Sequence, residues 1–205
     1  TINSFFIGIV ATAIATALGT LAALGLSRPH MPYKALIMSI LISPMIVPLI
    51  ITAAGMFFFY ARINLVYTFT GVILAHVALA TPFVVITVTA TLVGFDMNMV
   101  KAAQSLGAKP MRTFFKVIMP LILPGIISGA LFAFITSFDE VVIVMFMASI
   151  DQLTIPKQMW AGIRQEISPV ILCMATCLVL LSIILLTTVE LLRRRSEKLR
   201  GIKAR

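Results

Sequence analysis

Charged residues are scarce in this sequence and absent from several long stretches of it. Only 11% of the 205 residues are Asp, Glu, Lys or Arg, against roughly 25% in water-soluble domains. Residues 1–27, 63–95, 117–138 and 167–189 contain none of them. Each of these stretches can cross a bilayer core of about 30 Å as a helix of about 20 apolar residues. These features exclude a soluble enzyme with one buried core and indicate an all-α integral membrane protein with several spans.

Cysteine is also rare, since Cys173 and Cys177 are the only two. A disulfide-stapled fold is therefore excluded. No His or carboxylate at ligand spacing accompanies the two cysteines, so we predict no metal site and treat them as small packing residues. A disordered chain is excluded because 60% of the residues are hydrophobic and the mean hydropathy is +1.11.

The net charge of +9 is concentrated in two segments beside apolar stretches. Of the 16 Lys and Arg residues, seven lie in Arg193–Arg205 and four in Lys101–Lys116. Basic residues next to membrane spans mark the cytoplasmic side. The aromatic residues fall almost entirely inside apolar stretches, so the basic and aromatic surface that stacks nucleic-acid bases is missing. We expect membrane lipid, and no nucleic acid, among the partners.

Hydropathy and length predict a polytopic helical bundle with five visible spans. Basic residues in Ser27–Lys34, in Gly94–Leu121 and at the C-terminus place these segments in the cytoplasm. Thr1 then lies outside, and we expect a sixth span to precede it in the full chain. The predicted organisation is a transmembrane domain at 1–192 and a basic cytoplasmic tail at 193–205. The five spans are Ser4–Leu26, Ala35–Tyr60, Phe69–Val93, Ile122–Ala148 and Val170–Leu192.

Small residues recur at four-residue spacing in the first and fourth predicted spans. In lipid, such residues let helix backbones approach closely, so they mark faces where helices pack together. The pattern predicts a packed bundle. The two series are Ala11, Ala15, Gly19 and Ala23, and Gly125, Gly129, Ala133 and Ser137.

The connection 94–121 has the pattern of two short helices joined by a tight turn. Asp96 can cap a helix that starts at Met97, and Gly107 suits the left-handed position that ends it. Pro110 suits the first turn of the next helix. Such an element on the inner membrane face is either a docking site for a cytoplasmic partner or an amphipathic loop resting on lipid headgroups. The residue pattern alone leaves both open.

The same connection resembles the signature EAA-x3-G-x9-I-x-LP of the membrane permeases of binding-protein-dependent ABC importers. Lys101 stands where that family has Glu, while the exchanges at Val117 and Met119 are mild. Ala102, Ala103, Gly107 and Pro120 match the signature, and Lys101, Val117 and Met119 stand at its other fixed positions. Further stretches are similar to the spermidine/putrescine subgroup of these permeases. They are Ala75-His76, Ala80-Thr81-Pro82-Phe83-Val84-Val85, Ser137-Phe138-Asp139-Glu140 and Thr154-Ile155-Pro156-Lys157-Gln158-Met159-Trp160.

This resemblance implies a type I importer permease fold in the bacterial inner membrane. It implies a transport subunit without catalytic residues or a bound cofactor, because ATP and Mg belong to a separate cytoplasmic ATPase dimer. The absence of a GK[ST] phosphate-binding loop agrees with that division. A second permease subunit of different sequence and a periplasmic or extracellular solute-binding protein are the other implied partners. The residues implied to couple to the ATPase are Lys101, Ala102, Ala103, Leu106, Gly107, Phe114 and Phe115.

Asp139 and Glu140 are two acidic residues inside the predicted fourth span, toward its outer end. A charged residue near the bilayer centre costs at least about 2.5–3.5 kcal/mol, so neither is expected to face lipid. We predict that they line the path of a cationic solute such as a protonated polyamine, with Asp139 the first choice. A structural ion pair or hydrogen bond to a neighbouring helix is the alternative, above all for Glu140.

The connection 149–169 is predicted to face outward and to contain a short helix started by Thr154 and Pro156. The resemblance implies that this side faces the binding protein. The candidate contacts are Lys157, Trp160, Arg164 and Glu166. An interfacial helix packed over the bundle explains these residues equally well, since Trp is common at membrane interfaces.

A different class, a proton- or ion-coupled secondary transporter, would use Asp139, Glu140 and His76. It accounts for the acidic residues but leaves the Lys101–Pro120 spacing unexplained. We expect His76 to be hydrogen-bonded to a neighbouring helix. Within the importer class, putrescine or spermidine is the favoured solute, and amino-acid-derived or opine-like solutes are the alternatives.

Overall fold

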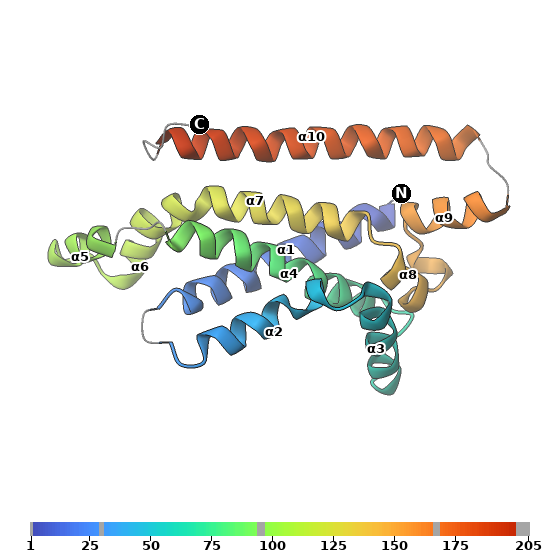
Figure 1. Cartoon of the computed structure of the whole chain (residues 1–205), viewed down its shortest axis with the longest axis horizontal. Coiled ribbons are helices and arrows are strands. Elements are labelled where there is room, and N and C mark those ends of the chain that lie inside the picture. The colour runs from blue at the N-terminus through green and yellow to red at the C-terminus, as the bar shows by residue number, and fades with distance from the viewer. Residues whose placement is uncertain (1, 29–30, 94–96, 166–168, 200–205) are drawn as a thin grey trace.

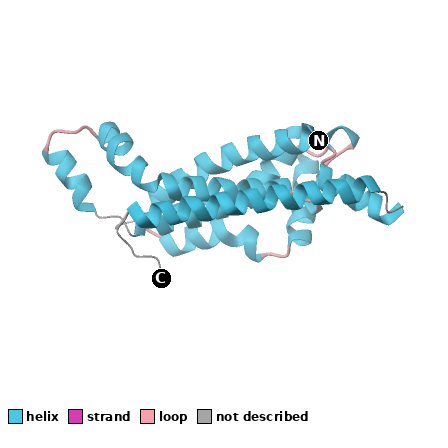
Figure 2. Cartoon of the chain, turned by 90° about the horizontal axis from the view of Figure 1, so that it is seen from above, coloured by secondary structure: helices cyan, strands magenta, loops and turns pink. Residues whose placement is uncertain are grey.

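The computed structural model describes residues 2–28, 31–93, 97–165 and 169–199, and the regular structure within these ranges is helical (Figure 2). Three long helices form the centre of an elongated bundle (Figure 1): α1 (Ile2–Leu26), α4 (Phe69–Val93) and α7 (Met119–Phe138). The short helices α5 (Met97–Ser105) and α6 (Pro110–Thr113) lie at one end. We call this the α5–α6 end.

At the opposite end of the bundle lie α8 (Val142–Met147), a 3₁₀ turn at Ile150–Gln152 and α9 (Ile155–Gln165). We call it the α8–α9 end. The last helix, α10 (Pro169–Leu199), runs back along α7 as the fifth predicted span (Figure 1). The most apolar part of α10 has no buried residue, so this helix presents its apolar side chains to the surroundings of the chain.

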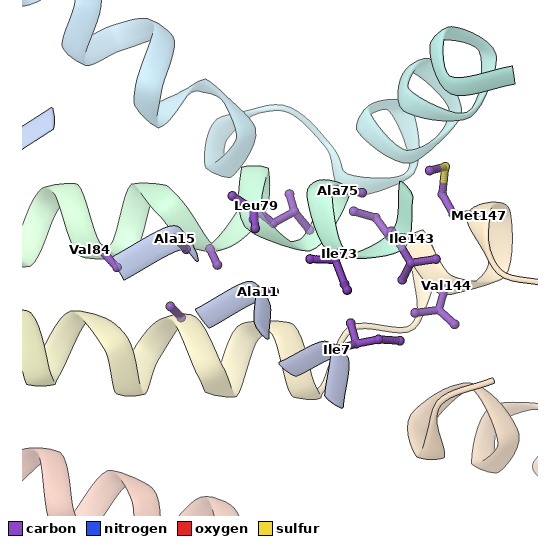
Figure 3. Packing of buried hydrophobic residues seen from close by; sticks show 14 of the residues in the cluster. Ile7, Ala11, Ala15, Ile73, Ala75, Leu79, Val84, Ile143, Val144 and Met147 are labelled. Carbon is purple, nitrogen blue, oxygen red and sulfur yellow. The ribbon is translucent and has the colours of Figure 1, made fainter. Parts of the chain in front are cut away.

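The central helices pack closely because small residues face one another. A Cβ atom added to Gly129 would lie 2.4 Å from Thr87 Oγ1, and one added to Gly19 would lie 2.6 Å from Val84 Cβ. Ala11, Ala15 and Ala133 are fully buried. Figure 3 shows Ile7, Ala11 and Ala15 of α1 among residues of α4 and α8 such as Val84 and Val144. The predicted packing role of the two small-residue series is confirmed.

The second predicted span, Ala35–Tyr60, is broken. It consists of α2 (Lys34–Ile46) and α3 (Leu49–Arg62), which meet at an angle of 104°. Val47 has extended backbone angles, φ −70° and ψ 134°, because the ring of Pro48 disfavours the helical region for the residue before it. Among the described residues, four helices are long and apolar enough to cross a membrane, and the α2–α3 pair is a fifth if it counts as one broken span.

The fourth predicted span, Ile122–Ala148, had wrong limits at both ends. One continuous helical run covers Pro110–Phe138 and includes α6, a π-helical segment at Phe114–Ile118 and α7. It stops at Phe138, and α8 is a separate helix. The stop follows from Glu140, whose carboxylate Oε1 accepts the backbone N–H of Ile143 across 2.9 Å. An acidic side chain that bonds a nearby backbone N–H favours the start of a new helix over continuation of the old one.

Candidate functional site

The turn between α5 and α6 closes as a Schellman motif. The backbone N–H of Ala108 donates to the carbonyl oxygen of Ala103 across 3.0 Å, and that of Gly107 donates to Gln104 across 2.9 Å. Gly107 has φ +79°, the left-handed conformation that glycine adopts at low cost. Pro110 is the first residue of α6. These observations confirm the predicted helix, turn and second helix, while the predicted cap Asp96 lies outside the described residues.

The loop exposes apolar side chains at the α5–α6 end of the bundle. Leu106 is 89% exposed and Phe115 is 58% exposed, with the Phe115 ring 5.1 Å from that of half-buried Phe114. Lys101, Ala102 and Gly107 are also exposed, and Ala103 is half-buried. Exposed large apolar side chains are typical both of protein docking surfaces and of surfaces that rest on lipid. The seven predicted coupling residues thus lie in α5, in the α5–α6 turn and in the π-helical segment after α6, and their role in coupling stays a prediction.

Met111 was missed by the sequence reasoning and belongs to the same surface. It lies in α6, next to the α5–α6 turn, and 68% of its side chain is exposed. Met99 on α5 is 50% exposed. Both are large apolar residues in the two short helices that the pattern predicts, and their place beside the predicted turn is the signal that could have identified them.

Asp139 and Glu140 are adjacent in sequence but have different surroundings. Asp139 ends α7, since its backbone N–H donates to Ile135 across 3.0 Å, and its side chain is exposed. Glu140 is 7% exposed and its carboxylate caps α8 through Ile143. The expectation that both lie within a helical span was wrong, because they occupy the break between α7 and α8. Asp139 therefore exposes its side chain at this break, while Glu140 bonds to the backbone of α8.

His76 is buried between α4 and α7. Its Nδ1 lies 2.8 Å from Ser137 Oγ, and the two share a hydrogen bond. The expectation that His76 is bonded to a neighbouring helix is confirmed.

The connection at the α8–α9 end is built from a capping box and a short helix. Ser149 and Gln152 satisfy each other's backbone N–H groups around the 3₁₀ turn, and α9 then begins at Ile155. Lys157 Nζ donates to the carbonyl oxygen of Ala148 across 3.3 Å, and burial lowers the pKa of Lys157. Trp160 is 48% exposed.

Two of the predicted contacts at this end are not open to comparison. Glu166 lies outside the described residues, and so does the side chain of Arg164.

The family described as "binding-protein-dependent transport system inner membrane component" matches residues 15–198 of the chain. The chain belongs to this family. It is therefore a membrane permease subunit of an ABC importer, a multi-pass inner-membrane protein without enzymatic activity, whose ATPase is a separate subunit.

Two curated permease proteins match nearly the whole chain, and a third matches half of it. The spermidine/putrescine transport system permease protein PotC of Haemophilus influenzae is 30% identical over 196 residues, which are 96% of this chain and 76% of the relative. PotC of Escherichia coli K12 is 28% identical over 96% of this chain and 74% of its own length. The putrescine transport system permease protein PotI of the same organism is 37% identical over 103 residues, half of this chain and 37% of PotI.

Solved transporter structures share the fold. A chain of the MetNI methionine ABC transporter, in an inward-facing conformation, superposes with a TM-score of 0.66 at 18% identity and covers 98% of this chain and 94% of its own. A chain of an amino acid ABC transporter gives 0.68 at 19% identity, with coverages of 95% and 91%. The predicted type I permease fold is confirmed.

Permeases of this family act with an ATPase, a second permease and a binding protein. The alternative function, a proton- or ion-coupled secondary transporter, is not favoured.

Proposed function

We propose that this permease forms part of the translocation path for a polyamine such as putrescine or spermidine. The observation that supports this substrate class most directly is the similarity to PotC over 96% of the chain. The exposed carboxylate of Asp139 supports it chemically, because a protonated amine pairs with a carboxylate through a charge-assisted hydrogen bond.

We propose that the solute contacts the translocation path at the carboxylate of Asp139. Asp139 follows the last turn of α7 at the α8–α9 end, where the helix stops and the chain turns into α8. Glu140 is proposed to keep that break in shape by capping α8, so that substitution of Glu140 would act on the path through the position of Asp139.

The α5–α6 end is proposed to face the cytoplasm, together with the C-terminal tail. Seven basic residues lie in Arg193–Arg205, and four lie in Lys101–Lys116, which is the charge distribution of cytoplasmic segments. The exposed apolar residues of the loop, above all Leu106, Met111 and Phe115, are proposed to dock into the ATPase. ATP and Mg are proposed to bind that partner, and no cofactor is proposed for this chain.

The α8–α9 end is then proposed to face the solute-binding protein. Helix α9 is the proposed contact, with Lys157 and Trp160 on it and Arg164 near its end. The second permease subunit is proposed to be a different chain, as the spermidine/putrescine subgroup implies.

The test is uptake of labelled putrescine into liposomes. Their membrane holds the two permeases with the ATPase dimer, ATP is enclosed inside, and the binding protein is added outside. We expect uptake that requires internal ATP and does not change when a protonophore is added. Uptake that collapses with the protonophore would overturn the ATP-driven mechanism. ATP-dependent uptake of an amino-acid-derived solute, with none of putrescine or spermidine, would overturn the substrate class and leave the importer in place.

A further inference from the structure

The first turn of α9 receives a hydrogen-bond cap from a different helix. The backbone N–H of Ile155 donates to Ser4 Oγ, in the first turn of α1, across 2.8 Å. The first N–H groups of a helix lack partners within it, and the preceding Ser or Thr side chain usually supplies one. Thr154 stands in that position, yet its buried Oγ1 has no hydrogen-bond partner among the described residues. The cap is therefore Ser4, 151 residues away in the sequence.

Asn3 extends this contact to the segment that leads into α9. Its side-chain Nδ2 donates to the carbonyl oxygen of Asp151 across 2.7 Å and to that of Leu153 across 3.1 Å. Ser4 is 2% exposed, so water does not compete for its hydroxyl. Three hydrogen bonds thus fix the main chain of 151–155 to the first turn of α1, and we call them the Asn3–Ser4 contact.

Helix α1 connects this contact to the rest of the bundle. It is one continuous helix from Ile2 to Leu26, and it is buried at intervals along its whole length. Near its start, a Cβ on Gly8 would lie 3.2 Å from Phe134 Cε2 of α7; further on, Gly19 packs on Val84 of α4. A displacement of α9 must therefore either move α1 or break the Asn3–Ser4 contact.

We propose that Asn3 and Ser4 are positioning residues, which hold α9 on α1 so that a binding protein docked at α9 acts on α1 and stimulates the ATPase. This inference rests on the proposed function of α9 as the contact for the binding protein. Without the Asn3–Ser4 contact, α9 would still bind that protein. Part of the binding free energy would then displace α9 by itself and would not act on α1.

The test compares four importers, assembled with the full-length permease in lipid nanodiscs. They contain the wild-type permease, Ser4→Ala, Asn3→Asp or the control Thr154→Val. Asn3→Asp keeps the shape of the side chain and removes both donors, while Thr154→Val removes the hydroxyl that general capping rules would select. Amide hydrogen exchange of residues 151–160 is measured without binding protein, and ATP hydrolysis is measured with and without polyamine-loaded binding protein.

We expect Ser4→Ala and Asn3→Asp to speed amide exchange at 151–160 and to lower the stimulated ATPase rate about fivefold, with an unchanged basal rate. Thr154→Val should retain wild-type exchange and stimulation. Unchanged exchange in both variants would overturn the contact. Faster exchange with full stimulation, or an equal loss of basal and stimulated rates, would overturn the positioning role.

Failure of the proposed function has a different signature. A wild-type importer that responds to binding protein loaded with another solute, but not with a polyamine, would overturn the substrate class. The variants are then compared with that solute, and the same fivefold loss in Ser4→Ala would support the positioning role on its own.

Discussion

His76 Nδ1 and Ser137 Oγ lie 2.8 Å apart and join α4 to α7 in the interior of the bundle. Both residues are buried, with 1% and 5% of their surfaces exposed. The second ring nitrogen of His76, Nε2, has no hydrogen-bond partner among the described residues. Ser137 is thus the group that satisfies this histidine, and it lies two residues before Asp139. The pair fixes the last turn of α7, and with it the place where the proposed solute contact begins.

Ser137→Ala should destabilise the permease because it leaves the imidazole buried without its partner. The expected loss is about 1–3 kcal/mol, the cost of an unsatisfied buried polar group. The double variant His76→Leu with Ser137→Ala should recover part of that loss, because both polar groups are then gone. Thermal unfolding of the purified complex in detergent measures both. Equal midpoints for the single and double variants would contradict this account of the pair.

Gly107→Val should uncouple transport from ATP hydrolysis by straining the α5–α6 turn. No atom lies within 4 Å of a Cβ added to Gly107, so the cost comes from its φ of +79° and not from crowding. L-residues pay about 1–2 kcal/mol in this conformation. Gly107→Asn is the matched control, because Asn tolerates the left-handed region better. We expect low uptake for Val and near wild-type uptake for Asn, at equal assembly with the ATPase. Equal uptake by the two variants would mean that the backbone conformation is irrelevant.

Asp139→Asn should weaken transport of a cationic solute while the complex still assembles. Loss of one charge-assisted contact is expected to raise the KM for putrescine about tenfold. Glu140→Gln is the contrasting variant, because Glu140 is buried and caps α8. It should lower the unfolding temperature more than Asp139→Asn does. Putrescine uptake at several concentrations and thermal unfolding are measured for both variants. If Glu140→Gln raised the KM more and Asp139→Asn lowered the unfolding temperature more, the two assigned roles would have to be exchanged.

Gly129→Val should disrupt the packing of α7 on α4. The added Cβ meets Thr87 Oγ1 at 2.4 Å and Val84 Cα at 2.9 Å, so the helices must separate. Overpacking of this kind costs about 1–3 kcal/mol. Gly25→Ala in α1 is the control, since nothing lies within 4 Å of its Cβ, and it should leave the unfolding temperature unchanged or slightly higher. If Gly129→Val lowered the unfolding temperature less than Gly25→Ala, the close approach of α7 and α4 at Gly129 would be refuted.

Local chemistry made part of this structure predictable from the sequence. The turn at Gly107 and the helix start at Pro110 depend on residues within a few positions, so ordinary capping rules located both. The faces of α1 and α7 that pack inside the bundle were marked by residue size alone. The start of α9 after Thr154 was also predicted.

The missed features depend on contacts between distant segments or on competition between neighbours. The hydropathy averaged over a span-length window stays high across Pro48, and it stays high across Asp139 and Glu140 because the flanking residues are apolar. Such a window therefore runs through both breaks in the helices. Only the geometry before Pro48 and the capping by Glu140 reveal them. The cap of α9 by Ser4 could not be inferred, because the rule that selects Thr154 considers the adjacent residue only.

The π-helical segment at Phe114–Ile118 sets the angular phase between the loop and the membrane-embedded helix. A π turn holds one more residue than an α turn, and each residue of an α-helix turns the chain by about 100°. The orientation of α6 about the helix axis, relative to α7, is therefore offset by a single residue. A one-residue deletion within 114–118 would leave composition and charge almost unchanged. It would, however, rotate the loop about the helix axis relative to the bundle. The angle between the loop and the bundle is thus set partly by a count of residues, independent of which residues they are.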